Sequence, residues 1–311
     1  MKFLITGGAG FIGAALANHL AVDGHEVRVI DDLSAGDAAR LHEAVLFTRG
    51  DVNDRPKLWT LLQDVECVYH LAARVSVSES LLYPREYNAV NVGGTVSVME
   101  AMRDAGVRRV VLASSGAVYG AQDTQPLHEG LRPNPDSPYA VSKLSAEYYV
   151  RTIGSLWGIE TVALRIFNAY GPGQPLPASH PPVVPRFLHQ AVTGGSLVIH
   201  GSGEQTRDYV FVSDVVDALA AAATAAGIDR QVINVGCGRD VSVRELAEVV
   251  SAVAGVELEP LVHGAETGGL ARMRADLTRA ADQLAYTPKV ALAAGLQRVL
   301  AEDPRFQRIP V

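Results

Sequence analysis

The first half of the chain alternates short apolar runs with longer amphipathic segments. The apolar runs are rich in Val, Ile and Leu and fit strands buried on both faces, at residues 2–6, 26–31, 44–51, 67–72, 109–114 and 161–167. The segments between them fit helices, at residues 11–24, 55–64, 84–106 and 137–158. This alternation is typical of βαβ units, so the pattern predicts an α/β fold with a doubly wound parallel sheet of the Rossmann type.

The pattern changes after residue 170. Residues 171–185 (GPGQPLPASHPPVVP) are dense in Pro and Gly and predict a loop, after which apolar structure resumes with helices near 185–195 and 242–255. We therefore expect a sheet domain over residues 1–170 and a smaller C-terminal lobe over residues 171–311. Their boundary is expected to interleave, because a late strand near 231–236 can rejoin the sheet.

Composition narrows the class of protein. With 48% hydrophobic and 20% charged residues in 311, the chain is expected to be soluble and globular. With a net charge of −7, the chain has no excess of positive charge with which to bind nucleic acid or an acidic membrane surface. No apolar run approaches the ~20 residues of a membrane span. Structure is expected from Lys2 onward, with no signal peptide. Neither Cys67, Cys237 nor any histidine pair has metal-ligand spacing, so we expect no metal and a reduced, cytoplasmic location.

A glycine-rich turn follows the first strand. Gly7, Gly10 and Gly13 in TGGAGFIG stand between a strand and a helix, where backbone amides can approach a phosphate. The first gap is one residue longer than in the common GxGxxG pattern. Asp31 ends the second strand, 18 residues after Gly13, where a carboxylate can bind a ribose 2′-hydroxyl and repel a 2′-phosphate. The sequence thus favours NAD over NADP. A turn-capping role is the alternative for Asp31, and it suits Asp32 better.

The stretch SPYAVSK (137–143) combines a phenol and an ammonium. Ser137 can cap a helix and Pro138 fits its first position, so Tyr139 falls in the opening turn with Lys143 beside it. A nearby cation and the helix N-terminus would both favour phenolate, which makes Tyr139 usable as a base. The alternative is a packed tyrosine beside a solvated lysine.

Several further motifs carry a resemblance. With the glycine turn and YxxxK, the motifs HLAA (70–73), NVGGT (91–95) and SSGAVYG (114–120) resemble the extended short-chain dehydrogenase/reductase family. RIFNAYGPGQ (165–174) and GEQTRDYVFVSDV (203–215) resemble its sugar-nucleotide epimerase/dehydratase branch. The similarity runs over nearly the whole chain in the family's order, and within the branch it is strongest to the UDP-glucose 4-epimerases.

The resemblance implies roles for individual residues. Tyr139 would exchange the proton of the sugar 4-hydroxyl, Lys143 would lower the tyrosine pKa and hold the nicotinamide ribose, and Ser115 would hydrogen-bond the reacting oxygen. The expected NAD contacts also include Gly7, Gly10, Phe11, Ile12, Gly13, Asp31, Asp32, Asp51, Val52, Leu71, Ala72, Ala73, Asn91 and Ser114.

Two positions separate the relatives within this branch. By the same resemblance, dehydratases carry acidic residues at positions 116 and 117, and decarboxylases tend to carry a glutamate at position 117. This chain has Gly116 and Ala117 there, with no carboxyl group. Neither reaction is therefore expected. Asn168 matches the substrate contact of glucose and galactose enzymes, whereas glucuronate 4-epimerases often carry Thr there.

The nucleotide end of the substrate is expected in the smaller lobe. Arg207 suits the diphosphate, because guanidinium donors match phosphate oxygens, with a salt bridge to Asp208 or Asp214 as the alternative. By resemblance, Val184 and Tyr209 would contact the UDP moiety. Relatives carry a second arginine where this chain has Glu266. Arg272 or Arg274 is expected to supply that charge from a shifted loop; the alternative is that both are surface arginines and the nucleotide is held differently.

The resemblance implies an enzyme that inverts C4 of UDP-glucose or UDP-galactose through a 4-keto intermediate, with NAD tightly bound. The alternatives are a UDP-N-acetylglucosamine or UDP-glucuronate 4-epimerase, another NAD-dependent nucleotide-sugar enzyme such as a net reductase, and a non-catalytic dinucleotide-sensing protein. A homodimer through the helices near 84–105 and 138–157 is also expected.

Overall fold

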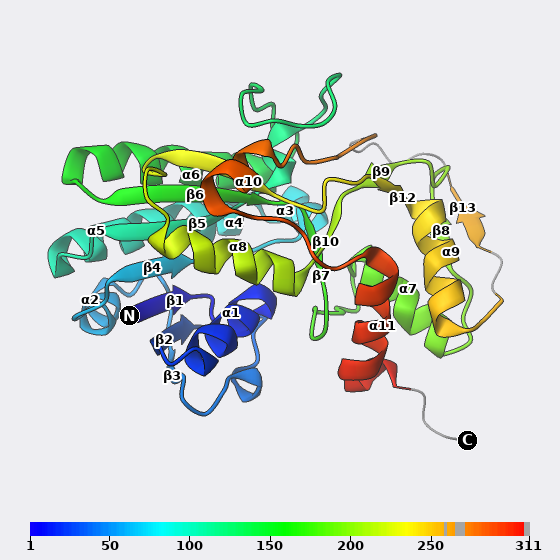
Figure 1. The fold of residues 1–311 in the computed structure, drawn as a ribbon, viewed down its shortest axis with the longest axis horizontal. Helices are drawn as coiled ribbons and strands as arrows, with labels where there is room; N and C mark the ends of the chain where they lie inside the picture. The colour runs from blue at the N-terminus through cyan, green and yellow to red at the C-terminus, as the bar shows by residue number, and fades with distance from the viewer. Residues whose placement is uncertain (258–259, 265–270, 308–311) are drawn as a thin grey trace.

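The computed structural model describes residues 1–257, 260–264 and 271–307, and its centre is one seven-stranded parallel sheet. The strand order is β11-β6-β5-β4-β1-β2-β3 (Figure 1). The doubly wound parallel sheet predicted from the sequence is confirmed. Its strands are β1 (Lys2–Thr6), β2 (Glu26–Asp31), β3 (Leu46–Arg49), β4 (Cys67–His70), β5 (Arg109–Ser115), β6 (Glu160–Ile166) and β11 (Gln231–Val235).

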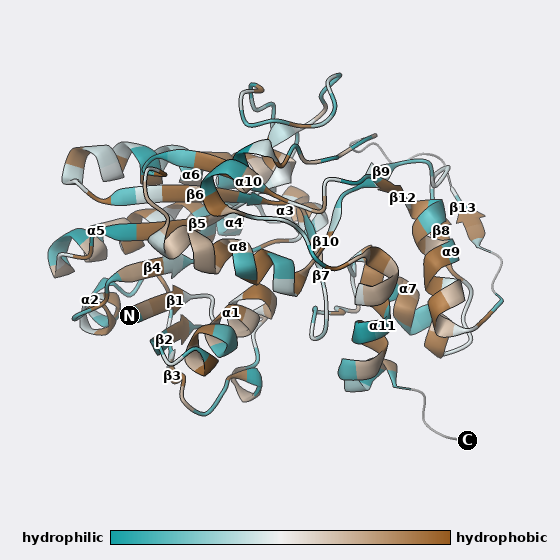
Figure 2. Ribbon diagram, in the orientation of Figure 1, coloured by the Kyte–Doolittle hydropathy of each residue, from teal (hydrophilic) through white to brown (hydrophobic). Residues whose placement is uncertain are grey.

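Helices cover both faces of this sheet. One layer contains α1 (Phe11–Val22), α8 (Val212–Thr224) and α10 (Thr278–Leu284), and the other contains α2 (Arg55–Leu61), α5 (Gly94–Ala105) and α6 (Pro138–Trp157). Each layer closes its own apolar core, as expected for parallel strands that are buried on both sides. The strands carry mainly hydrophobic residues, whereas the helices carry both kinds (Figure 2). None of the described helices is long and apolar enough to cross a membrane.

Three segments after residue 170 belong to the sheet layers rather than to the smaller lobe. Strand β11 pairs in parallel with β6, with Val232 opposite Ala163. Helix α8 packs beside α1, and α10 packs against β11 and α8. The chain therefore crosses between the two parts several times.

The smaller lobe lies beyond the carboxyl ends of the strands (Figure 1). Its core gathers Phe187, Leu246 and Leu296 from three helices. These helices are α7 (Val183–Val192), α9 (Val243–Ala254) and α11 (Leu292–Glu302), with the short strands β7 (Asn168–Tyr170), β8 (Val198–His200), β9 (Thr206–Arg207), β10 (Tyr209–Phe211), β12 (Val241–Ser242) and β13 (Leu261–His263).

The helix expected over residues 84–106 is divided into three pieces. Helix α4 (Pro84–Tyr87) leads into a π-helical turn, η2 (Asn88–Gly93), before α5 begins. A further helix, α3 (Val77–Leu82), precedes it and was not expected. Three short 3₁₀ turns complete the described structure: η1 (Ala38–Arg40), η3 (Gly116–Tyr119) and η4 (Pro304–Phe306).

Candidate active site

The glycine turn joins β1 to α1 at the carboxyl edge of the sheet. Gly7 has a φ of +68°, and a Cβ there would lie 2.6 Å from the backbone of Ala72. A Cβ on Gly13 would overlap the Gly7 carbonyl oxygen. No side chain caps α1, whose N-cap is Gly10, so the amides of Phe11 and Ile12 are open to an anion. The turn thus fits the pyrophosphate of a dinucleotide.

Asp31 lies at the end of β2, against this turn. Its Oδ2 accepts the Ala9 amide at 3.0 Å and its Oδ1 accepts the Leu33 amide at 2.8 Å. Burial raises the pKa of Asp31, and these two amides act in the opposite direction. Asp31 therefore both shapes the local turn and holds a carboxylate where a ribose is expected. Asp32 accepts the Ser34 amide at 2.8 Å, which is the turn-capping role expected for it.

The other expected NAD contacts follow the ends of neighbouring strands. Asp51, after β3, is exposed and accepts the Asn53 amide at 2.8 Å, while Val52 is buried against Gly94. Residues 71–73 follow β4 and are half-buried beside the glycine turn. Parallel strands bring these segments to one edge, where α/β folds bind their ligands.

Asn91 and Ser114 have buried side chains with protein partners. Asn91 Oδ1 accepts the Arg74 amide at 2.8 Å, and its Nδ2 donates to the Arg74 carbonyl and to Ser142 Oγ at 3.0 and 2.9 Å. Ser114 Oγ donates to Glu147 Oε1 at 2.5 Å. Asn91 therefore holds the segment after β4 against α6, and Ser114 holds β5 against the same helix.

Tyr139 and Ser115 meet at the start of α6. Ser137 caps this helix through the Ala140 amide, and Tyr139 lies in its first turn with 9% of its surface exposed. The ring of Tyr87 packs edge-on against it. Burial raises the pKa of Tyr139, and a side-chain hydrogen bond with Ser115 acts in the opposite direction. A phenol and a hydroxyl are thus paired at the carboxyl end of β5.

Lys143 is buried one turn further along α6, with 5% of its surface exposed. Its Nζ donates to the Ala113 carbonyl at 3.0 Å. Burial lowers the pKa of Lys143 to about 8, and the charge of Glu147 acts in the opposite direction. The alternative of a solvated lysine is therefore wrong. Ser115, Tyr139 and Lys143 come together as a potential acid–base group.

In the smaller lobe, Asn168 and Tyr209 are paired residues of β7 and β10. Tyr209 is buried, and its hydroxyl has no hydrogen-bond partner among the described residues. Val184 is buried on α7. Arg186, two residues along the same helix, interacts electrostatically with Tyr209, and its Nε also lacks a partner within the described chain. The sequence reasoning missed Arg186, although it lies only two residues after Val184.

Two expected diphosphate ligands lie near β9. Arg207 is half-buried, and its Nη1 donates to the Thr206 carbonyl at 2.7 Å. Burial lowers the pKa of Arg207, and the charges of Tyr209 and Asp136 act in the opposite direction. The side chain of Arg272 is 59% exposed and forms an ion pair with Asp240 at 3.0 Å. Glu266 lies outside the described residues.

Asp208 is fully buried and connects three segments around these arginines. Its carboxylate accepts the amides of Cys237, Gly238 and Ala275, the first at 2.5 Å and the others at 2.9 and 3.0 Å. These bonds occupy both carboxylate oxygens. Met273, two residues before Ala275, packs beside Gly116 and so brings this segment over the end of β5.

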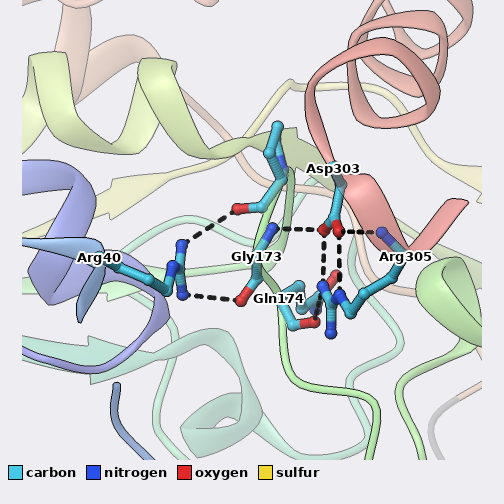
Figure 3. A network of polar contacts seen from close by, with 6 residues as sticks. Arg40, Gly173, Gln174, Asp303 and Arg305 are labelled. Atoms are coloured by element: carbon cyan, nitrogen blue, oxygen red, sulfur yellow. Dashed lines mark hydrogen bonds and ion pairs between the residues drawn. The ribbon is translucent and has the colours of Figure 1, made fainter. Parts of the chain in front are cut away.

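A network of polar contacts, which we call the lobe clamp, joins the two parts of the molecule beside the glycine turn (Figure 3). Arg40 donates to the carbonyl oxygens of Gly173 and Pro172 at 2.8 and 3.3 Å. The Gly173 amide donates to Asp303 Oδ2 at 2.7 Å. Gly173 has a φ of +77°, and a Cβ there would overlap the Arg40 guanidinium, so the clamp requires glycine.

The lobe clamp extends to the end of the described chain. Arg305 pairs with Asp303 at 2.6 Å and donates to the Gln174 carbonyl at 2.8 Å. Burial acts to raise the pKa of Asp303, but Arg305 and the Gly173 amide hold it below its ordinary value.

Among the described residues, no group of three His, Cys, Asp or Glu side chains could hold a metal ion.

Comparisons with known proteins identify the family of the chain. Residues 3–236 match the model of the NAD dependent epimerase/dehydratase family. The chain is 41% identical to a UDP-glucose 4-epimerase of Mycolicibacterium smegmatis, over 96% of this chain and 97% of that protein. It is 33% identical to the structure of a Thermotoga maritima UDP-glucose 4-epimerase with UDP-glucose, with a TM-score of 0.93 over 97% and 98% of the two chains.

A second solved structure extends the range of substrates among similar proteins. It is a UDP-N-acetylglucosamine 4-epimerase from Methanobrevibacter ruminantium M1 in complex with UDP-N-acetylmuramic acid. This chain is 32% identical to it, with a TM-score of 0.91 over 96% and 97% of the two chains.

Proposed function

This chain belongs to the NAD-dependent epimerase/dehydratase family, and we propose that it inverts C4 of UDP-glucose and UDP-galactose while its NAD stays bound. The observation that carries the proposal is the buried group Ser115, Tyr139 and Lys143 at the carboxyl end of β5. It supplies one proton-transferring residue beside the dinucleotide turn. An epimerisation through a 4-keto sugar needs that chemistry and no net oxidant.

The residues after Ser115 support epimerisation over elimination. Gly116 and Ala117 carry no carboxyl group, and a Cβ on Gly116 would lie 3.2 Å from Met273 Cε and from the ring of Phe167. A dehydratase acid would not fit at this position without displacing both neighbours. The site therefore lacks the acid for loss of water from the sugar, and a side chain at position 116 would have to push Met273 and Phe167 aside.

The acid–base work falls to Tyr139. When bound at the turn, NAD supplies a hydride acceptor and a positively charged ring. The Tyr139 oxygen takes the proton of the C4 hydroxyl and, after the 4-keto sugar has turned over in the site, returns it to the C4 oxygen as that carbon is reduced on its opposite face, with Ser115 beside the reacting oxygen. Burial raises the pKa of Tyr139 in the protein alone, so its ionisation depends on nearby positive charge. Lys143 is the protein's own source of that charge.

The nucleotide is proposed to bind in the smaller lobe. Tyr209 and Arg186 offer a hydroxyl and a guanidinium nitrogen that lack partners in the described chain, as expected for groups that meet a ligand. Arg207 adds positive charge on the neighbouring strand. The guanidinium of Arg272 is held by Asp240 in this structure. To bind the diphosphate, Arg272 has to leave that ion pair.

An NMR time course of the purified protein with UDP-glucose and no added NAD tests the proposal. UDP-galactose should appear and reach a fixed equilibrium ratio. Product only with added NAD would remove the retained cofactor but keep the reaction, and no product in either case would reject this substrate. Conversion of UDP-N-acetylglucosamine or UDP-glucuronate instead would reassign the sugar. Binding of NAD without turnover of any UDP-sugar would favour a dinucleotide sensor.

We also propose a homodimer in the cytoplasm. Of the two helices expected at the interface, α6 exposes large apolar side chains, whereas the described residues 84–105 expose none; other exposed apolar side chains lie on α3, which packs beside α6. The exposed side chains of α3 and α6 are Val77, Leu81, Leu82, Val141, Tyr148, Tyr149 and Leu156. Burial of this surface against a second copy would remove it from water. The free thiols of Cys67 and Cys237 fit a reducing compartment. Sedimentation of the protein, with Leu81→Asp as a disrupting change, tests the dimer.

A further inference from the structure

Three consecutive residues of β5 contact three residues of α6 that are spaced four apart. Ser115 lies close enough to Tyr139 to act on its hydroxyl, the Ala113 carbonyl accepts from Lys143, and Ser114 Oγ donates to Glu147. Residues four apart lie on one helical face, so Tyr139, Lys143 and Glu147 form one row along α6. Tyr139 and Lys143 have chemical roles in the proposed reaction, whereas that reaction gives no role to Glu147.

Glu147 is a buried carboxylate with every oxygen engaged. Only 2% of its surface is exposed. Arg165 of β6 donates to both of its oxygens, from Nε at 2.9 Å and from Nη2 at 2.8 Å. The Arg165 guanidinium in turn lies 4.6 Å above the ring of Tyr119. Such a pair is costly to bury, and its two-point geometry fixes the carboxylate in one place.

The other groups around Lys143 provide no negative charge. His70 of β4 is buried and lies close enough for the Lys143 charge to act on it, but its pKa is lowered to about 3, so it is neutral. Burial raises the pKa of Tyr139 of α6 and of Tyr119 of η3, so neither phenol supplies a negative charge in the protein without its cofactor. Arg165 is positive. Glu147 lies one turn from Lys143 on the same face of α6, and its negative charge acts in favour of the Lys143 ammonium.

We propose that Glu147 is a positioning residue for the proton transfer, which keeps Lys143 charged and fixes the Tyr139 helix against β5 through Ser114 and Arg165. The role rests on the proposed epimerase function, because it acts through Lys143 on Tyr139. Its physical basis, the coupling of Glu147 to Lys143, is a property of the protein that can be measured without turnover.

Glu147→Gln tests the role in catalysis, because it removes the charge at constant shape. The alkaline limb of the kcat–pH profile should move to lower pH by about one unit, and kcat at pH 8 should fall about 5-fold, because the protonated fraction of Lys143 drops from about one half to about one tenth. KM and NAD content should change less than about 2-fold, since Glu147 touches neither ligand. Glu160→Gln makes the same charge change at an exposed position and should leave the profile unchanged. A profile that does not move in Glu147→Gln overturns the proposal.

Two further measurements keep the test independent of folding defects and of the substrate. Glu147→Gln combined with Arg165→Met removes both partners, so it should recover stability while the limb stays shifted; a limb that returns with stability would make Glu147 merely structural. The free energy of unfolding is then compared between proteins with and without Lys143→Met from pH 6 to 10. The pH at which this difference changes reports the Lys143 pKa, and it should lie lower when Glu147 is replaced. An unmoved midpoint overturns the coupling, whatever UDP-sugar the protein uses.

Discussion

Arg40 and Gly173 are joined across the two lobes, because the guanidinium of Arg40 donates to the Gly173 carbonyl oxygen at 2.8 Å. The two sides of this contact border the glycine turn. The Asp37 amide, near Arg40, bonds to the Ala9 carbonyl, and the position of a Cβ on Gly171, near Gly173, is 3.5 Å from the Phe11 ring. The lobe clamp therefore spans the place where the pyrophosphate is expected.

Gly173→Ala should loosen the lobe clamp. The new methyl group would displace the Arg40 guanidinium, and the left-handed backbone adds strain of about 1 kcal/mol. We expect a loss of about 2–3 kcal/mol in unfolding free energy and faster release of NAD. Gly194→Ala is the matched control, because its φ is +73° with nothing near the added Cβ. Equal stability and equal NAD release in the two variants would contradict the clamp's role.

Tyr139→Phe should separate chemistry from cofactor binding. Loss of the phenolic oxygen removes the proton acceptor while the ring still packs against Tyr87. Turnover should fall at least about 100-fold with NAD content unchanged. The check is an NMR rate combined with the NAD released on denaturation. Wild-type turnover in this variant would exclude Tyr139 as the base.

Tyr209→Phe should make the protein more stable and a poorer enzyme. Its buried hydroxyl has no partner among the described residues, so its removal should stabilise the fold by about 1 kcal/mol. If that hydroxyl binds the UDP moiety, KM should rise about 10-fold. Tyr69→Phe removes a similarly unpartnered, buried hydroxyl from β4 and should stabilise the protein without raising KM. An unchanged KM in Tyr209→Phe would place the nucleotide elsewhere.

His70 should make the fold sensitive to acid. Thr95 donates to the Asn91 carbonyl, so it accepts from His70 Nε2, and His70 Nδ1 accepts from Thr6 Oγ1 at 2.7 Å. Burial lowers the pKa of His70 to about 3, and the charge of Lys143 acts in the same direction. The unfolded chain therefore binds a proton below pH 6.5 that the folded protein excludes.

From this linkage, His70 should cost about 1.4 kcal/mol of unfolding free energy for each pH unit below 6.5. His70→Gln keeps a polar side chain and removes the titration, so its stability should fall less steeply between pH 6.5 and 4. Urea unfolding at a series of pH values measures the difference. Parallel curves for the two proteins would show that His70 does not carry this acid sensitivity.

Local pattern was sufficient to predict the sheet and to bring together much of the proposed catalytic group. Runs such as RVVLAS and TVALRIF are apolar at nearly every position because both faces of their strands are covered, and that burial is visible in the sequence. Tyr139 and Lys143 were visible because helical spacing alone places them together. The glycine turn was visible because its conformation restricts the residue type.

Contacts between distant segments left no such pattern. Helix α3 was missed because Leu81 and Leu82 are exposed, so VSESLL lacks a periodic buried face. The partners of Ser114 and Asn91 depend on how deeply β5 and η2 lie under α6, which sequence spacing does not encode. Arg40 is one charged residue at the end of the short turn η1, and only folding brings Gly173 to it.

Strand β11 comes late in the sequence, and this has a consequence for the nascent chain during synthesis. During synthesis, β6 is complete well before residues 231–235 leave the ribosome, and α8, which covers one face of the sheet, also comes after residue 170. Until both arrive, the growing polypeptide presents the open edge of β6 and an uncovered apolar face. Such an edge readily recruits strands from other chains. Chains that end between residues 170 and 235 should therefore aggregate instead of folding as a free domain.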